Sequence, residues 1–253
     1  TKLAALIAQL NEIDHETGSL EGNGLNLADV VGGGNGFGTG TYRNGIDART
    51  AKIQTRDFGQ LGNVVTNRFS PSPFDFVDGV FIPDGQNGTA EIPVSSTGLT
   101  ITGIPTTSGN AWDMIRNGPV ASQHSTELGG IDFAKEGHAL LGLHANAGIT
   151  FDLDAIRIAS RQDRLRFQTQ LGYFGADDGS QADAWIFLDG KREFDFKELR
   201  RADGLQQVEI EIPAQTRFLT LVSTDGGNGF GMDQIGFGDP HLKSSQPTVL
   251  TKP

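Results

Sequence analysis

Short runs in which apolar and polar residues alternate set the strongest limit on the fold of this chain. In GITFDLDAIRI (148–158), Ile149, Phe151 and Leu153 alternate with polar residues, which is the period of a half-buried strand. LRFQTQLGYF (165–174) alternates in the same way. Turn-forming residues separate such runs, and 35 of the 253 residues are glycine. This texture predicts an all-β fold with many turns.

Helical signals are confined to two short segments. TKLAALIAQLNEID at the start places Leu3, Leu6, Ile7 and Leu10 on one face, so residues 1–22 are predicted to form a short helix and linker. FDFKELRRADG (194–204) is predicted to be a short helical insert.

The remaining chain is predicted to form one β-sandwich domain over residues 23–242, followed by a flexible tail, 243–253. Residues 48–128 form a long β-rich insertion within it. FDFVDGVFIPDG (74–85) and TAEIPVSSTGLTITGIP (89–105) contain its strand signals, and we expect these strands to pair with each other or with the main sheet.

Composition excludes several classes of partner. The formal charge is -11 without a cluster of Lys or Arg, so nucleic acid and anionic membrane surfaces are not expected to bind. No apolar run has the length of a membrane span, so membrane insertion is not expected either. Cysteine is absent, which excludes a disulfide scaffold. The start at Thr1 and the polar tail indicate a piece of a longer protein.

The order of motifs in the second half resembles a known family. GLHANAGITFDLDAIR (142–157) is followed by RFQTQLGYFGADDGSQADAWIFLDG, then by RFLTLVSTDGGNG (217–229) and DPHL (239–242). This order is similar to the NPCBM family, carbohydrate-binding-like modules with a galactose-binding, jelly-roll β-sandwich fold. The resemblance covers residues 129–242, and residues 26–47 more loosely.

The resemblance implies a non-catalytic carbohydrate-binding module of a larger bacterial protein that is secreted, periplasmic or on the cell surface. The expected partner is a neutral oligo- or polysaccharide. The alternative is a structural or protein-interaction β-sandwich that binds no sugar. An enzyme is not expected, because the chain has no G-x-S-x-G, H-E-x-x-H or Cys nucleophile and no carboxylate pair that stands out.

Scarce aromatics are the best candidates for sugar contacts, because a pyranose ring packs its C–H groups on an aromatic face. Trp112 lies in the polar stretch SGNAWDMIRNG; its alternative role is to anchor the insertion on the sandwich. Trp185 lies in a run that is apolar on both faces, which favours a core position. The predicted ligand-binding residues are Trp112, Asn110, Asp113, Arg116 and Tyr173.

Acidic turns are the candidates for a metal. Asp177, Asp178 and Asp183 lie in ADDGSQAD, while Asp225 and Asp233 flank a glycine-rich turn. Carboxylates and backbone carbonyls are the ligands that Ca²⁺ prefers, so a structural calcium ion is one interpretation and solvated acidic turns are the other. No other cofactor is expected. His144 matches the Gly-x-His-Ala position of the family, where the resemblance implies a buried, hydrogen-bonded imidazole.

The hexapeptide GGNGFG occurs twice, at residues 33–38 and 226–231. Neither copy fits G-x-G-x-x-G, so a structural turn is predicted instead of a phosphate cradle. Because the first and last strands of a jelly roll lie side by side, we expect the two copies to be neighbours, with Phe37 and Phe230 turned inward. Their glycines permit φ > 0, and Asp225 or Asp233 is expected to bind the N–H groups of the turns or to hold a cation against their carbonyls.

Overall fold

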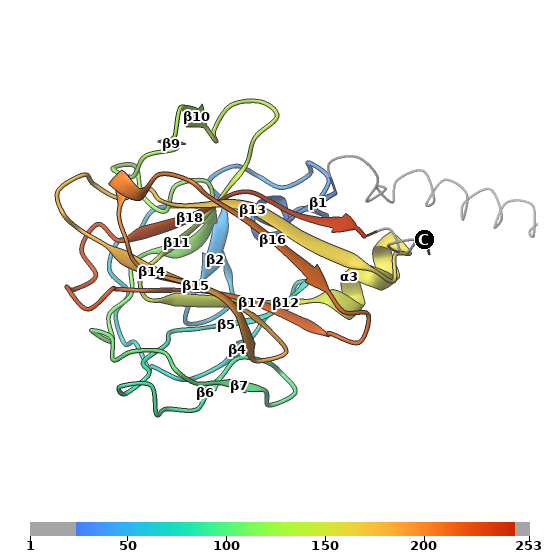
Figure 1. Ribbon diagram of the computed structural model, residues 1–253, viewed down its shortest axis with the longest axis horizontal. Coiled ribbons are helices and arrows are strands. Elements are labelled where there is room, and N and C mark those ends of the chain that lie inside the picture. Colours follow the sequence, from blue (N-terminus) through green and yellow to red (C-terminus); the bar gives the residue numbers. More distant parts are fainter. Residues whose placement is uncertain (1–23, 246–253) are drawn as a thin grey trace, which may run out of the picture.

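The computed structural model describes residues 24–245, which form two facing antiparallel sheets (Figure 1). The first sheet has the order β16-β13-β18-β11-β8-β2-β3, and β1 also pairs with β18. The second has the order β15-β14-β17-β12-β5-β4. The predicted all-β jelly-roll sandwich is confirmed. The predicted helix at 1–22 and most of the predicted tail lie outside the described residues.

The strands of the first sheet are β1 (Leu25–Asn26), β2 (Gly45–Asp47), β3 (Ile53–Gln54), β8 (Met114–Asn117), β11 (Leu140–His144), β13 (Leu165–Tyr173), β16 (Gln206–Ile212) and β18 (Gln234–Ser244). Those of the second are β4 (Ser70–Pro71), β5 (Val77–Phe81), β12 (Ala147–Asp152), β14 (Ala182–Leu188), β15 (Lys191–Leu199) and β17 (Phe218–Thr224). Two small hairpins are β6 (Ile92–Pro93) with β7 (Thr100–Ile101), and β9 (Glu127–Leu128) with β10 (Ile131–Asp132).

The main core lies between the two sheets and follows from the alternation in the sequence. In β13, Leu165, Phe167, Thr169 and Leu171 are buried, while Arg166, Gln168 and Gln170 between them are partly exposed. A side chain on every second residue of a strand reaches the same face, so one face of β13 packs on the second sheet. The predicted 48–128 insertion supplies β5 to one sheet and β8 to the other.

A third layer covers the outer face of the second sheet. Trp185, Phe187, Phe81 and Val222 lie on that face and are buried beneath a cluster from residues 92–104; Figure 1 shows the β6–β7 hairpin on this side. This layer explains why the DAWIFLDG strand is apolar on both faces. The predicted core position of Trp185, which is 0% exposed, is confirmed.

Two secondary-structure predictions are wrong. The segment 194–204 continues strand β15 and ends in a 3₁₀ turn, Arg201–Asp203, instead of a helix. The reason is that Phe194 and Phe196 both face the core at a spacing of two. GITFDLDAIRI is a strand only to Asp152, whose side chain accepts N–H bonds from Asp154 and Ala155 and so begins α3 (Leu153–Ser160). A second short helix, α2 (Leu27–Val31), begins in the same way at Asn26.

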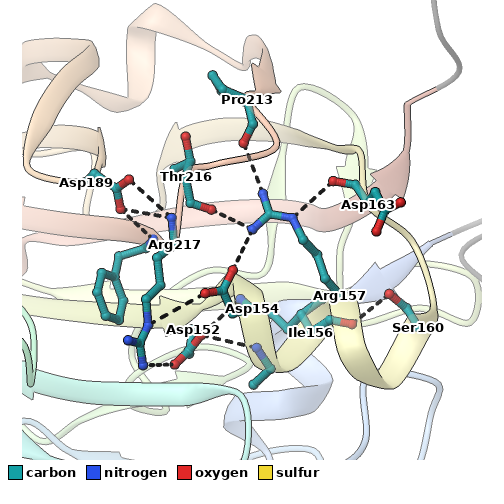
Figure 2. A network of polar contacts seen from close by, with 12 residues as sticks. Asp152, Asp154, Ile156, Arg157, Ser160, Asp163, Asp189, Pro213, Thr216 and Arg217 are labelled. Carbon is teal, nitrogen blue, oxygen red and sulfur yellow. Dashed lines mark hydrogen bonds and ion pairs between the residues drawn. The ribbon is translucent and has the colours of Figure 1, made fainter.

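A dense polar network closes the α3 end of the sandwich (Figure 2). The Arg157 guanidinium donates to the carbonyl oxygens of Asp163, Pro213 and Thr216 and to the Asp154 carboxylate. Arg217 donates to Asp152 in the same region. These bonds tie α3 to the loop that follows it and to the distant β16–β17 loop.

The predicted contact between the two GGNGFG copies is wrong. The first and last strands do pair, with Leu25 opposite Leu242, and the first copy attaches there through the Asn26 N–H bond to the Gly36 carbonyl. The second copy lies before Gln234, at the other end of β18. Eight residues of strand span about 26 Å, so β18 separates the copies.

Candidate functional site

Loops from both halves of the chain meet at the end of the sandwich where β18 begins, which we call the loop end. Its segments are 57–61, 108–113, 119–124, 144–146 and 225–234. Backbone bonds join them: the Leu61 N–H donates to the Ala111 carbonyl, and the Asn146 N–H donates to the Asn110 carbonyl. The Asp225 carboxylate accepts the Ser108 N–H at 2.6 Å. The loop end is therefore one connected surface.

Four rings form an aromatic cluster around His144 at the loop end. The ring centre of His144 lies 6.0 Å from that of Trp112, 5.2 Å from that of His124 and 6.2 Å from that of Phe230. Trp112 and Phe230 are partly exposed, whereas both imidazoles are buried. Aromatic faces and edges thus reach the surface with polar nitrogen atoms directly beneath them.

Three N–H donors in or beside this cluster have no hydrogen-bond partner among residues 24–245: Trp112 Nε1, His124 Nε2 and Gln234 Nε2. The other polar atoms of the last two side chains are used. His124 Nδ1 accepts the Ala121 N–H, and Gln234 Oε1 accepts the Val120 N–H at 2.6 Å. Gln234 is also the cross-strand partner of His144. Because buried polar groups are normally paired, these three donors have unused hydrogen-bonding capacity close to the partly exposed rings of Trp112 and Phe230.

Both imidazoles are neutral at ordinary pH. Burial lowers the pKa of His124 to about 4. Burial also lowers the pKa of His144 to about 3, although the bond from its Nδ1 to the Ala145 carbonyl opposes this shift. The expected buried, hydrogen-bonded His144 is confirmed, since the residue is 3% exposed. The cluster therefore offers neutral donors, which suit uncharged hydroxyl groups better than anions.

The structure separates the predicted ligand-binding residues into two groups. Asn110 and Trp112 lie partly exposed at the loop end. Asp113, Arg116 and Tyr173 are 0% exposed. Arg116 bonds Asp57 at 2.5 Å and lies 3.5 Å from the Asp113 carboxylate, where burial raises the pKa of Asp113 to about 6.

These buried charges hold the segment that borders Trp112. Asp113 Oδ1 accepts the Phe58 N–H, and the Asp113 N–H donates to the Gly59 carbonyl. Gln60 forms an isolated bridge with Trp112. Segment 57–60 consequently covers part of the indole, so Trp112 is neither fully open nor fully enclosed.

The five candidate metal ligands contact different groups instead of facing one another. Asp177 and Asp178 are exposed, and Asp178 accepts the Ser180 N–H. Asp183 accepts the Glu198 N–H and the Thr224 hydroxyl, while Asp225 accepts bonds from Ser108 and Asn146. Within residues 24–245, no three His, Cys, Asp or Glu side chains gather closely enough to hold a metal ion.

Asp233 differs from the other four aspartates. Its Oδ1 receives the Tyr173 hydroxyl at 3.4 Å, and its Oδ2 has no partner in the described part of the chain. Burial, reinforced by the nearby Asp225 carboxylate, raises the pKa of Asp233 to about 9. The group is therefore protonated at neutral pH, a state in which it is a weak ligand for a cation.

Sequence reasoning did not identify His124 and Gln234 as parts of this cluster. Gln234 lies 114 residues from Val120, the residue whose N–H it accepts, and only the β11–β18 pairing brings it beside His144. The sequence offered one signal for His124 as a site residue, namely that histidine is scarce in this chain, with 5 residues.

Comparison with known families identifies the chain. The model described as NPCBM/NEW2 domain matches residues 102–243. The chain belongs to the NPCBM/NEW2 domain family. The match includes residues 102–128, which were predicted to lie in the insertion, and it contains most of the loop end: Trp112, His124, His144, Phe230 and Gln234 all fall within it.

Solved structures of CBM51 modules are similar to part of this NPCBM/NEW2 chain. CBM51 from Clostridium perfringens GH95, in complex with methyl-galactose, has 22% identity and a TM-score of 0.44, covering 53% of this chain and 90% of that one. The M60 catalytic domain with two CBM51 domains from Clostridium perfringens ZmpB has 23% identity and a TM-score of 0.42, covering 54% of this chain and 14% of that one.

Tandem CBM51 modules of a family 98 glycoside hydrolase from Streptococcus pneumoniae have 20% identity and a TM-score of 0.37, covering 46% of this chain and 33% of that one. The chain thus spans only a small part of the two multidomain neighbours. None of the curated proteins matches the chain. In residues 24–245, no helix is long and apolar enough to cross a membrane.

Proposed function

We propose that this chain is a non-catalytic carbohydrate-binding module and that it binds a neutral sugar at the loop end. The observation that carries the proposal is the set of three unpartnered donors around His144, on Trp112, His124 and Gln234. A sugar hydroxyl or ring oxygen supplies acceptors, and the partly exposed rings of Trp112 and Phe230 supply faces for its C–H groups.

In this proposal, some residues of the loop end contact the sugar and others hold those residues in position. Trp112 and Asn110 contact the sugar directly. Asp113 and Arg116 act from below, because they fix segment 57–60 against the indole. Tyr173 fixes the 232–233 turn through its bond to the Met232 carbonyl at 3.0 Å.

The setting that family membership favours is a longer bacterial protein outside the cytoplasm, at the surface, in the periplasm or secreted. The module would bring that protein to a glycan and leave any chemistry to its other parts. A structural calcium ion near Asp225 is compatible with this role but is not required by it.

A titration with methyl-galactose, followed by backbone amide NMR, tests the proposal. We expect shifts at Trp112, His124 and Gln234 and at the Trp112 indole N–H. Trp112→Ala should weaken binding by roughly tenfold or more, because stacking and one hydrogen bond are lost together.

Phe37→Ala is the matched control, since Phe37 is an exposed aromatic at the other end of β18. It should leave the affinity unchanged. If Trp112→Ala lowers the melting temperature steeply and a panel of neutral glycans shifts none of these amides, the sugar proposal fails and the protein-interaction alternative replaces it.

A further inference from the structure

One pocket, outside the loop end, is lined by two arginines. It has a volume of about 540 Å³ and lies between the turn that joins β2 to β3 and the segment 63–71. Its lining includes Arg49, Arg68, Asn63, Thr50, Val65 and Phe69, and no carboxylate. In a chain with a formal charge of -11, a concave surface of this composition is unusual.

Arg49 forms one rigid wall of this arginine pocket. Its Nε and Nη2 donate to the two oxygens of the buried Asp47 carboxylate, at 3.2 and 2.8 Å, and its Nη1 donates to the Gly62 carbonyl. The Ser70 hydroxyl donates to the Arg49 carbonyl. Since each terminal nitrogen carries two hydrogens, one N–H on each remains for a ligand.

Arg68 supplies the uncompensated charge. It is exposed and has no hydrogen bond or ion pair with any residue of 24–245, whereas Asp47 balances the charge of Arg49. The backbone beside it is fixed, because Asn67 donates to the Asp84 carbonyl and its N–H donates to the Ile82 carbonyl. The pocket thus has a net positive charge on a stable frame.

We propose that the arginine pocket binds the acidic group of a saccharide, either a carboxylate or a sulfate. Guanidinium forks match both groups in geometry and in charge. Thr50 and Asn63 offer polar atoms for hydroxyls, and Val65, which is 59% exposed, offers an apolar surface for ring C–H groups. The anion follows from the pocket itself, while its attachment to a sugar rests on the proposed carbohydrate function.

Amide NMR titrations with glucuronate, glucose 6-sulfate and glucose test this proposal, and inorganic sulfate and tetraglutamate serve as anions without a sugar. We expect glucuronate or glucose 6-sulfate to shift the amides of Thr50, Asn63 and Arg68, and glucose not to. Arg68→Gln should weaken this binding by roughly tenfold. Raising the salt from about 0.05 M to about 0.5 M should weaken it too, since exposed charges are screened.

Arg56→Gln is the matched control, because Arg56 is exposed, has the same charge and does not line the pocket. It should leave the binding of the acidic sugar unchanged. Inorganic sulfate or tetraglutamate binding as tightly as the acidic sugars would overturn the saccharide assignment. Unshifted pocket amides with all ligands would overturn the anion site itself.

The two sites are distinguished by Trp112→Ala. If both proposals hold, this variant loses methyl-galactose and keeps glucuronate, and Arg68→Gln does the reverse. If the wild-type protein binds glucuronate but does not bind methyl-galactose, the loop-end proposal fails and the arginine-pocket proposal stands. Glucuronate binding that depends on Trp112 and not on Arg68 would overturn the arginine pocket.

Discussion

The two GGNGFG copies have the same six residues and different structural roles. Gly36 and Gly229 occupy the same position in the motif and have almost the same φ, 90° and 94°. A Cβ at Gly36 would lie 2.4 Å from Leu25 Cγ, whereas a Cβ at Gly229 would meet nothing within 4 Å. The first copy packs against the core, and the second projects into solvent.

The phenylalanines of the two copies also differ in burial, but here the second copy has the more closely packed residue. Phe37, predicted to turn inward, is 36% exposed, while Phe230 packs edge-on against His144 in the aromatic cluster. Positive φ occurs at three of the four glycines in each copy, and the copies share it at the first and fourth positions of the motif. The comparison shows that the two copies repeat the positive-φ backbone only at the first and fourth positions of the motif, and that the surrounding chain determines the rest of the turn and which side of it is buried.

The largest expected effect comes from substituting the equivalent glycines. Gly36→Ala should lower the free energy of unfolding by about 4 kcal/mol, from the strain of positive φ together with the clash on Leu25. Gly229→Ala should cost about 1 kcal/mol, because only the strain of φ applies. Chemical denaturation of both variants measures the difference. Equal costs would show that the two copies are packed alike.

The carboxylate of Asp29 is expected to have the next largest effect. Asp29 is 6% exposed and accepts the N–H groups of Gly36 and Gly40, both at 2.7 Å. Asp29→Ala leaves both donors without a partner, so stability should fall by about 3 kcal/mol. Asp178→Ala, which removes an exposed aspartate that accepts one N–H, should cost no more than about 0.5 kcal/mol. Similar losses in the two variants would contradict the special role of Asp29 in the first copy.

The second copy leads into Asp233, which makes stability depend on pH. The folded protein holds a proton on Asp233 up to about pH 9, and the unfolded chain releases it near its ordinary value. Stability is therefore complete at low pH and falls as the pH rises. We expect a loss of about 4 kcal/mol between about pH 5 and pH 8 from this group, at about 1.4 kcal/mol per pH unit, measured by urea denaturation. Asp233→Asn should flatten that dependence, and an unchanged slope would show that another group causes it.

Substituting the phenylalanines of the two copies should change the affinity for sugar to different extents, and this is the smallest of the expected effects. Phe230→Ala removes a ring from the aromatic cluster and should weaken methyl-galactose binding by roughly fivefold, as expected for about 1 kcal/mol of ring contact. Phe37→Ala should have no effect on affinity. Isothermal titration calorimetry of the two variants measures this. An equal loss in both would mean that the loop end is not where the sugar binds.

The strands were predictable where local alternation and burial agree. β13 alternates along its length, and β14 is uniformly apolar because both of its faces are covered. β15 was mistaken for a helix because its edge position leaves most of its residues exposed and charged, so Phe194 and Phe196 were its only apolar pair. The start of α3 was missed because Asp152 serves as the last residue of a strand and as a cap.

The candidate site was less predictable because it depends on contacts between distant residues. The polar setting of Trp112 in the sequence left two roles open, a ring exposed for a sugar and an anchor of the insertion on the sandwich. The same pattern does not reveal that Arg116 would be buried by an ion pair with Asp57, 59 residues away. Likewise, nothing near Asp29 in sequence shows that its carboxylate would close a turn seven residues later.

The antiparallel pairing of β1 with β18 has a mechanical consequence. Gly24 and the residues after Leu242 leave this ladder at the same end, away from the loop end. A force that pulls the two chain ends apart acts along the hydrogen bonds of the ladder, so the bonds open one after another, beginning at Leu25 and Leu242. The β1–β18 ladder therefore resists such a force weakly, and it lies at the end of the sandwich opposite the loop end.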